Sequence, residues 1–441
     1  MELLTNPVLL SVLLMCVLCL VKVNILMAIM ISAVAAGLLH GFPIGDTMKH
    51  LIGGMGGQSE TALSYILLGA LAVGISETGL ATILANKVEK VVGKNGKIFL
   101  LVLAGIACCS QNIIPVHIAF IPILVPPLLK VMNDMKLDRR GAACALTFGL
   151  KAPYIAIPAG FGLIFQGIIA DNMNLNGMAV DRTAIWSYMI IPALGMVCGL
   201  FLAIFVSYRK PRVYEDREIN LSGDDDCKPK TMVTDHFTKE HLGAGLGAVS
   251  AFAIQLITGS LPLGALVGLC IMIAFGSIPF KSMDSTVGGG VRMMGFIAFV
   301  MLVASGFGNV IRETGAVSAI VEASVGIVGG SQLIAAVIML FIGLIITMGI
   351  GTSFGTIPII ATIYVPICAE LGFSAAATAI LVGVAGALGD AGSPASDSTL
   401  GPTAGLNADG QHDHIWDTCV PTFLHYNIPL MIFGTLGALI F

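Results

Sequence analysis

Residues 389–399 read Gly-Asp-Ala-Gly-Ser-Pro-Ala-Ser-Asp-Ser-Thr, and they interrupt an apolar stretch that extends over 374–402. The interruption contains two carboxylates, four hydroxyl groups, two glycines and a proline. Glycine and proline weaken or break helices, and ionisable side chains are costly in hydrocarbon, so they mark functional sites there. The stretch therefore predicts an interrupted membrane helix whose break carries a polar site.

An earlier stretch has a similar character. Residues 149–158 read Gly-Leu-Lys-Ala-Pro-Tyr-Ile-Ala-Ile-Pro, so Lys151 and two prolines lie within an otherwise apolar segment. Pro158-Ala159 recurs later in the chain as Pro394-Ala395. We therefore expect two corresponding breaks, with Lys151 lying inside the first of them.

The composition places the whole chain in a membrane. Of 441 residues, 56% are hydrophobic and 11% are charged, whereas about a quarter of the residues of a soluble domain are charged. One soluble core cannot bury that much apolar surface, so lipid must surround the protein. The net charge of −4 lacks the basic footprint of a nucleic-acid-binding protein. Membrane spans are predicted at 7–21, 24–42, 61–85, 141–170, 183–207, 242–257, 262–280, 293–311, 374–402 and 415–441.

Two further apolar segments, 98–132 and 331–369, each have a polar break in the middle. The breaks are Ser110-Gln111-Asn112 and Gly351-Thr352-Ser353. Basic loops flank the first segment on both sides, and short basic loops face the cytoplasm. Both ends of that segment then lie on one side of the membrane, which favours a re-entrant hairpin over two short spans. Irregular backbone at membrane depth is tolerated where it lines a protein cavity.

Repeated motifs and charge indicate two inverted halves. The Ile-Ser-Glu-Thr-Gly of 75–79 recurs as the Ile-Arg-Glu-Thr-Gly of 311–315, at the same offset as the two Pro-Ala pairs. Alternating spans put 18 of the 22 basic residues inside and only Lys49, Arg182 and Arg312 outside. An odd number of crossings in each half turns the second copy upside down. The predicted parts are a first membrane repeat at 1–207, a cytoplasmic linker at 208–241 and a second, inverted repeat at 242–441.

The acids of the second break need a balancing charge. No lysine or arginine follows Arg312, yet Asp390 and Asp397 lie in an apolar part of that half. A buried unpaired charge is strongly destabilising, so Lys151, a proton or a metal cation must balance them. One hypothesis pairs one acid with Lys151 and gives the other to a coupling cation, with hydroxyls and freed carbonyls as the hard oxygen ligands that Na⁺ prefers. The alternative is a fixed structural pair of Lys151 and Asp390.

These residues also resemble a known family. The motif at 389–399, followed by His414 and Pro421, is similar to the C-terminal signature of NhaC-type Na⁺/H⁺ antiporters in the ion-transporter superfamily. The stretch 389–425 is closer still to a branch proposed to carry amino acids, histidine among them. The resemblance implies that the second break forms the ion or substrate site and that the two hairpin tips reach it. The departure from the antiporter consensus at 401–403 and 409–411 favours a function beyond plain Na⁺/H⁺ exchange.

Together these arguments predict an all-α polytopic membrane protein of two inverted repeats, with about 10 spans, two re-entrant hairpins and two interrupted helices. The predicted substrate-binding residues are Ser110, Gln111, Asn112, Lys151, Thr352 and Ser353. The predicted cation-binding residues are Asp390, Ser393, Ser396, Asp397 and Thr399. Neither a cofactor nor a metal beyond a transported Na⁺ is expected, because the acids and histidines at 412–417 match no closed zinc pattern.

The leading functional prediction is a secondary active transporter of the bacterial inner membrane. It would couple Na⁺ or H⁺, by symport or antiport, to a small carboxylate-bearing solute, with an amino acid as the expected solute. Lys151 among broken-helix ends suits such a headgroup. The partners are then membrane lipid and the solute, and a homodimer is compatible. The alternatives are Na⁺/H⁺ antiport without organic substrate and, more remotely, an intramembrane serine protease with the GxSxG of 351–355 and His425 as base. An enzyme is otherwise not expected.

Overall fold

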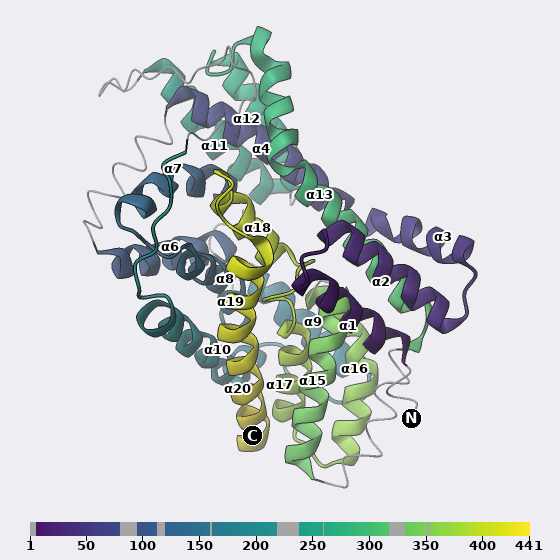
Figure 1. Ribbon diagram of the computed structural model, residues 1–441. Coiled ribbons are helices and arrows are strands. Elements are labelled where there is room, and N and C mark those ends of the chain that lie inside the picture. The colour runs from purple at the N-terminus through teal and green to yellow at the C-terminus, as the bar shows by residue number, and fades with distance from the viewer. Residues whose placement is uncertain are drawn as a thin grey trace.

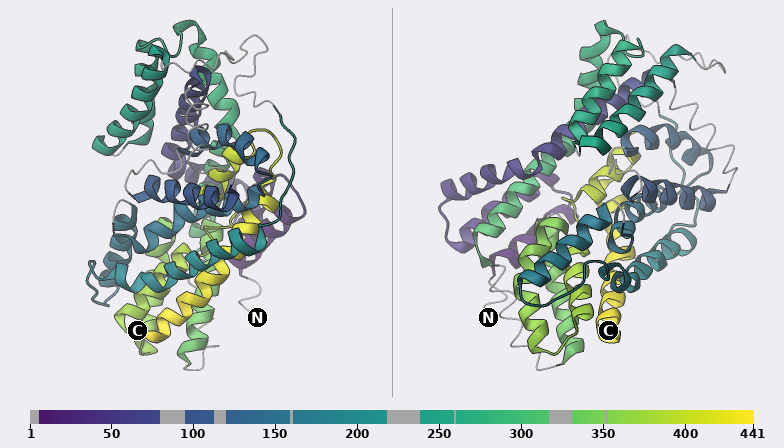
Figure 2. Two further views of the ribbon diagram at one scale, coloured as in Figure 1. Left: turned by 90° about the vertical axis from the view of Figure 1, so that its left-hand side faces the viewer. Right: turned by 180° about the vertical axis from the view of Figure 1, so that it is seen from behind.

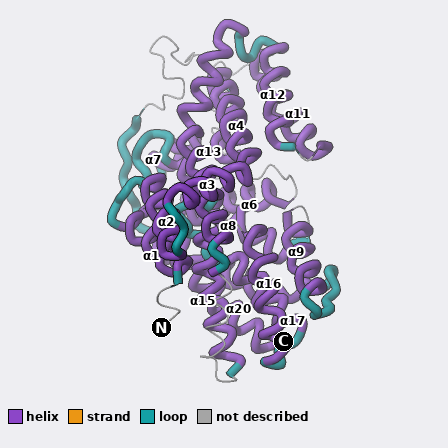
Figure 3. The backbone as a smooth tube through the Cα atoms, turned by 90° about the vertical axis from the view of Figure 1, so that its right-hand side faces the viewer, coloured by secondary structure: helices purple, strands orange, loops and turns teal. Residues whose placement is uncertain are grey.

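The computed structural model describes residues 6–79, 95–112, 120–158, 161–217, 238–258, 260–316, 331–350 and 353–441. Every regular element in these ranges is a helix (Figure 3), so the predicted all-α class is confirmed. The first half contains α1 (Pro7–Leu20), α2 (Ile25–His40), α3 (Ile44–Met55), η1 (Gly56–Gln58), α4 (Ser59–Thr78), α6 (Gly96–Asn112), α7 (Phe120–Asp134), α8 (Arg139–Ala156), α9 (Phe161–Leu175), α10 (Ile185–Leu202) and η3 (Ala203–Ser207).

The second half repeats the same order of helices. It contains α11 (Lys239–Thr258), α12 (Leu261–Ala274), η4 (Phe280–Ser282), α13 (Met283–Glu313), α15 (Gln332–Ile350), α16 (Ser353–Glu370), α17 (Ala375–Ala387), α18 (Asp397–Leu406), η5 (His414–Cys419), α19 (Val420–Thr422), η6 (Phe423–Asn427) and α20 (Ile428–Ile440). In the helix pairs α2 and α12, α6 and α15, and α8 and α17, the two starts are separated by the same offset as the repeated sequence motifs. The division at 208–241 stays a prediction.

Several helices are long and apolar enough to cross a membrane. Among the described residues there are five, or up to seven if each of two bent pairs counts as one span. The five are Ile44–Thr78, Ile185–Ser207, Met294–Glu313, Gln332–Ile350 and His414–Ile440. The bent pairs, each with an angle of 48°, are Arg139–Ala156 with Phe161–Leu175, and Ser353–Ala361 with Ile363–Glu370. Shorter apolar helices such as α1, α2, α12 and α17 accompany them.

Two predicted boundaries were wrong. The third predicted span, 61–85, begins too late, because α3 and η1 continue its helix back to Ile44. A Cβ at Gly306 of α13 would lie 2.4 Å from the carbonyl oxygen of Leu51, so α3 packs directly on α13. The first break also lies later than predicted, since α8 continues through Lys151 and Pro153 to Ala156. One proline removes only one hydrogen bond, and the close packing that buries α8 on most sides keeps it helical.

The helices form two hydrophobic clusters. The smaller cluster joins α4, α11 and α12, which lie together at one end of the molecule in Figure 1. The views in Figure 2 keep α11 and α12 at the end remote from the chain's C-terminus. The larger cluster contains both interrupted helices and α20. Helix α13 passes closely along α4, where a Cβ at Gly290 would lie 2.3 Å from the backbone nitrogen of Ala70.

Candidate functional site

Lys151 and Asp390 meet in the interior of the larger cluster. Lys151 extends from α8 in the first half, and Asp390 lies in the turn of residues 388–396 between α17 and α18. The ammonium group contacts Asp390 Oδ2 and lies 3.6 Å from Asp397 Oδ1. The Lys151 and Asp390 side chains are 7% and 3% exposed. The structure thus brings one lysine of the first half between two acids of the second.

Hydroxyl groups complete the surroundings of Asp390. Ser396 donates to Oδ1, and Ser353, the first residue of α16, donates to Oδ2 beside the lysine. The phenol of Tyr154 lies 2.9 Å from the Ser353 oxygen. A helix N-terminus, a helix break and the last turns of α8 therefore converge on one carboxylate. Tyr154 was not predicted, although it directly follows Pro153 in the stretch that was singled out.

The turn of residues 388–396 requires its glycines. Gly389 and Gly392 have φ angles of 80° and 96°, in the left-handed region that favours glycine. A Cβ at Gly389 would lie 2.5 Å from the carbonyl oxygen of Leu344, and one at Gly392 would lie 2.6 Å from Phe423 Cβ. Any side chain would push this turn away from the helices behind it. The glycines therefore fix where Asp390 lies.

Asn427, at the end of η6, hydrogen-bonds to the backbone of the same turn. Its side-chain amide donates to the carbonyl oxygen of Ala391 at 2.7 Å and accepts from the backbone N–H of Gly389 at 3.2 Å. Asn427 is 1% exposed and lies in η6. Sequence reasoning missed it, because an isolated asparagine in an apolar span gives no sign of which turn it contacts. Its two bonds satisfy backbone groups that the broken helix frees.

The side chains of the other predicted cation ligands mainly form hydrogen bonds with backbone groups of the turn. Thr399 donates to the carbonyl oxygen of Ser393 at 2.5 Å, and the Ser393 hydroxyl accepts from the backbone N–H of Ala395 at 3.2 Å. Ser396 is the N-cap of α18 and also contacts Asp390. Ser393 and Thr399 thus shape the turn, whereas Ser396 reaches the carboxylate. Hydroxyl, carbonyl and carboxylate oxygens lie within one turn, which is the donor chemistry that suits a hard cation.

The side chains of four predicted substrate-binding residues lie outside what the structure describes. The backbone of Ser110, Gln111 and Asn112 ends α6, but their side chains are not among the described ones. Thr352 falls in the undescribed pair of residues before α16. Only Lys151 and Ser353 of the predicted substrate set can be placed, and both contact Asp390.

A cavity of about 200 Å³ adjoins the second break. Its lining includes Gln58 at η1, Ser305 and Arg312 on α13, Gly355 on α16, and Ala395. Ala395 directly precedes Ser396, which contacts Asp390. The cavity therefore lies between α13 and the polar turn, and its lining residues include a glutamine, a serine and an arginine. Sequence reasoning had placed Arg312 outside and gave it no role.

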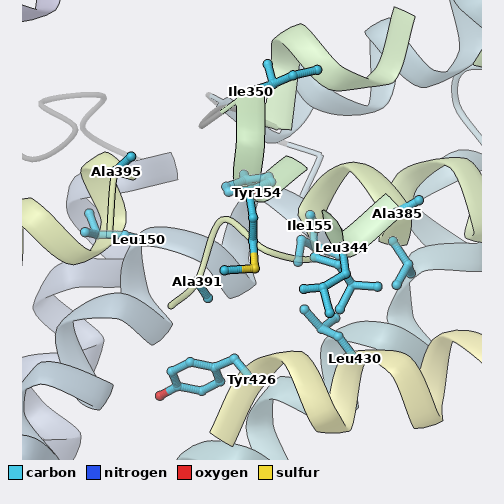
Figure 4. Close-up of a cluster of buried hydrophobic side chains, with 14 of the residues drawn as sticks. Leu150, Tyr154, Ile155, Leu344, Ile350, Ala385, Ala391, Ala395, Tyr426 and Leu430 are labelled. Atoms are coloured by element: carbon cyan, nitrogen blue, oxygen red, sulfur yellow. The ribbon is translucent and has the colours of Figure 1, made fainter. Parts of the chain in front are cut away.

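Apolar side chains enclose the polar groups. Figure 4 shows Leu150 and Tyr154 of α8 with Ala391 and Ala395 of the turn and Ile350 at the end of α15. All five side chains are buried. Such surroundings make an unbalanced charge expensive, so Lys151 and the acids must balance one another's charge. The site is polar only at its centre.

A second buried ion pair joins the halves and was missed. The Arg139 guanidinium donates to both Asp409 oxygens, at 2.7 and 2.6 Å, and to the carbonyl oxygen of Leu406 at 3.0 Å. Its side chain is 0% exposed and that of Asp409 is 2% exposed. Tyr214 covers the guanidinium, with its ring centroid 4.2 Å away. Arg139 and Asp409 both lie at helix ends, outside the predicted spans, where the sequence indicated loops exposed to solvent.

Asp409 lies outside the spans, and its ionisation follows from these contacts. Burial raises the pKa of its carboxyl group, but hydrogen bonds and charge from Arg139, with hydrogen bonds from Gln411, outweigh burial and hold the pKa below its ordinary value of 3.8. The pair is therefore ionised throughout the physiological range.

The arrangement of a serine protease is not formed. Ser353 bonds Asp390 and Tyr154, whereas His425 Nε2 lies 2.8 Å from the Ser207 hydroxyl and His425 Nδ1 lies 2.7 Å from the carbonyl oxygen of Pro421. The proposed base therefore contacts other groups than the proposed nucleophile. Among the described residues, no group of three histidines, cysteines or acids could hold a metal ion.

Comparison with known proteins gives matches over almost the whole chain. A model described as the Na⁺/H⁺ antiporter family matches residues 145–435, and another described as the Na⁺-H⁺ antiporter family matches residues 6–92. An uncharacterized membrane protein of Vibrio parahaemolyticus is 49% identical over 450 residues, covering 99% of this chain and 100% of its own. The Bacillus subtilis protein YuiF, whose name proposes an amino acid transporter, is 48% identical, with coverage of 99% and 100%.

Two solved structures are more distantly similar. The YdaH transporter of Alcanivorax borkumensis has a TM-score of 0.44 at 14% identity, covering 90% of this chain and 89% of its own. MtrF of Neisseria gonorrhoeae, described as one of a class of antimetabolite efflux pumps, has a TM-score of 0.39 at 14% identity, with coverage of 89% and 84%.

Proposed function

We propose cation-coupled transport of a small carboxylate-bearing solute for this chain, which belongs to the Na⁺/H⁺ antiporter family. Membership was predicted from the motif at 389–399 and is confirmed by the family models and by relatives that span the chain. The chain is a multi-pass membrane protein of a transporter family. The coupling ion, the solute and the residues that bind them belong to the proposal.

The observation that carries the proposal is the sharing of one buried lysine by two carboxylates. Lys151 contacts Asp390 and lies 3.6 Å from Asp397. A proton or Na⁺ that binds these carboxylates competes with the ammonium group for the same oxygens, since each cation is stabilised by the same negative charge. Binding of the coupling ion therefore loosens the bond between α8 and the second break. This change is the local event that we assign to coupling.

The solute is best placed in the adjoining cavity. Its volume of about 200 Å³ corresponds to roughly seven waters at about 30 Å³ each, enough for a small organic molecule. No acidic side chain of the described residues forms an ion pair with Arg312, and the neighbouring Glu313 faces His50 at 4.0 Å instead. A guanidinium binds a carboxylate through two parallel hydrogen bonds. We therefore transfer the solute-carboxylate contact from Lys151, which the acids already neutralise, to Arg312.

An amino acid fits this division of roles. Arg312 would bind its carboxylate, and the Gln58 amide in the same lining offers hydrogen bonds to its other polar groups. The Ser305 hydroxyl donates to the Gly54 carbonyl oxygen at 2.8 Å, so its oxygen is an acceptor for the solute's ammonium group. The proposed activity in the name of YuiF points to the same class of solute. Ala395 lines the cavity and directly precedes Ser396, which contacts Asp390. Solute bound in the cavity can therefore affect cation binding at Asp390, and the reverse.

Counterflow of labelled amino acids in proteoliposomes tests the proposal. We expect at least one amino acid to exchange, with a rate that depends on a Na⁺ or proton gradient. Arg312→Gln should raise the KM for the solute about tenfold, as expected for loss of a charge-assisted bond, and should leave the cation dependence unchanged. Arg292→Gln, on the same helix but outside the cavity lining, is the matched control.

Plain antiport is the competing outcome. If no amino acid is carried while a Na⁺ gradient drives proton movement through the same vesicles, the organic solute is ruled out and the coupling site alone remains. If Arg312→Gln and Arg292→Gln have equal KM values, the solute does not bind through Arg312.

A further inference from the structure

Three segments that are far apart in sequence meet around a groove of about 590 Å³. The groove is lined by residues 95–97 and Leu100 at the start of α6, residues 135–138 between α7 and α8, and Ile204 with residues 208–211 after α10. From its charge, shape and surroundings we infer that this groove binds the headgroup of an anionic phospholipid. The site is separate from the transport site and independent of the proposed solute.

The lining has an excess of positive charge. It contains Lys97, Lys136, Arg209 and Lys210, all exposed, and one acid, Asp138. Asp138 already accepts from Arg140 at 2.6 Å, and in the part of the chain that the structure describes no carboxylate lies within ion-pair distance of the four basic groups. Four cations around one hollow repel one another, and a phosphate placed among them would relieve that repulsion.

An exposed apolar surface borders the groove. Lys97 lies over the ring of Phe205 at 5.3 Å, and Phe205 stacks on Phe201 at 5.7 Å between ring centroids. Both rings are exposed, as are Leu202, which follows Phe201, and Ile98, which follows Lys97. A soluble anion gains nothing from this surface, whereas a phospholipid places its acyl chains there when its phosphate occupies the groove. The combination favours lipid over a free anion.

The position in the membrane agrees with this ligand. The three segments belong to the loops that the charge distribution predicts to be cytoplasmic, and the structure brings them side by side. Anionic lipids are enriched in the cytoplasmic leaflet and attract basic groups at its surface. A groove at this level therefore lies where such headgroups are available.

Lys136 offers an unusually clean test. Its φ angle is 51°, in the left-handed region, because it follows the end of α7, where glycine is usual. Lys22 has the same conformation, with a φ angle of 66°, directly after α1 and its cap, and it is not part of the groove. Lys136→Gly and Lys22→Gly each remove one charge and relieve the same backbone strain, so both variants should fold.

The experiment titrates lipid into the purified full-length protein in detergent and follows thermal unfolding. Phosphatidylglycerol should stabilise the protein at lower concentration than phosphatidylethanolamine. Lys136→Gly should raise the half-saturating concentration of phosphatidylglycerol about fivefold, and Lys22→Gly should not change it. Adding Lys97→Gln, Arg209→Gln and Lys210→Gln to Lys136→Gly should abolish the preference for phosphatidylglycerol. Native mass spectrometry should show retained phosphatidylglycerol on the wild type and less on Lys136→Gly.

Three results would overturn the inference. Equal stabilisation by both lipids would show that charge is not recognised. Equal titrations for Lys136→Gly and Lys22→Gly would place the lipid elsewhere. Inorganic phosphate that stabilises the wild type and displaces phosphatidylglycerol at similar concentration would make the ligand a soluble anion.

Discussion

Two buried ion pairs connect α8 to the second half of the chain, and they are built differently. Arg139 begins the helix and binds Asp409 through its two terminal guanidinium nitrogens, at 2.7 and 2.6 Å. Lys151 lies about 18 Å further along the same helix, at about 1.5 Å per residue, and is shared by Asp390 and Asp397. One pair is a closed fork, whereas the other is a point charge between two acids.

The difference indicates which pair can change during transport. An arginine remains protonated in proteins and its planar fork fixes one geometry, whereas a lysine rotates about a flexible stem and can lose its proton. The Arg139 pair also has the Leu406 carbonyl and Asn133 as partners, at 3.0 and 2.9 Å. The Lys151 pair lies next to a turn of hydroxyls and a cavity. We therefore expect the first pair to hold structure and the second to respond to cations.

The largest expected effect is on transport in Asp390→Asn. Removing this charge abolishes the competition between Lys151 and the coupling ion, so the transport rate should fall about 100-fold, the lower range expected for breaking a buried pair. Initial uptake in proteoliposomes, measured over a range of Na⁺ concentrations and pH values, gives the result. Near-normal rates at every cation level would make the Lys151 pair a structural contact only.

For Asp409→Asn we expect a large loss of stability and little change in transport. It leaves an arginine that cannot lose its proton buried without a carboxylate, so the free energy of unfolding should fall by about 3–5 kcal/mol. Uptake per folded molecule should stay within about threefold of wild type, a difference of about 0.7 kcal/mol or less, because Asp409 does not contact the Lys151 site. Thermal unfolding and uptake on the same preparations separate the two quantities. A transport loss as large as that of Asp390→Asn would place both pairs in the transport cycle.

Paired apolar replacements sharpen the comparison. Replacing a whole buried ion pair by apolar residues is often neutral for stability. The double variant Arg139→Met with Asp409→Leu should therefore recover most of the stability lost in Asp409→Asn, and it should transport. Lys151→Met with Asp390→Leu should also fold, but it should not transport. Recovery of transport in the second double variant would remove the coupling role from these residues, and uptake assays on folded protein decide it.

The features that could be predicted from the sequence are those that local sequence patterns determine. Helical class follows from apolar segments of spanning length, and the duplication follows from motifs that recur at a constant offset, which the helix starts repeat. The contact of Lys151 with the second-half acids was expected because no lysine or arginine follows Arg312. The break itself was placed too early, since tertiary packing keeps α8 helical through Pro153.

The partners that sequence could not supply come from packing between distant segments. Asn427 and Tyr154 reach the second break only because η6 and α8 lie beside it. Arg139 and Asp409 stand at helix ends, where a charged residue is normally solvated, and their burial depends on the cover that Tyr214 provides. No periodicity or motif encodes such contacts.

The smallest expected effect is a pH dependence confined to the Arg139 pair. Because the pKa of folded Asp409 lies below 3.8, the pair's contribution to stability is complete well above that pH and is lost as the pH falls through and below it. Asparagine does not titrate, so the difference in unfolding free energy between wild type and Asp409→Asn should be constant at pH 5–7 and shrink below about pH 4, by at most about 1.4 kcal/mol per pH unit. Thermal unfolding of both proteins in one buffer series measures the difference. If this difference in unfolding free energy instead narrows as the pH rises, the folded protein holds Asp409 protonated. The Arg139 pair would then not be a permanently ionised pair, and this contrast with the Lys151 pair would be wrong.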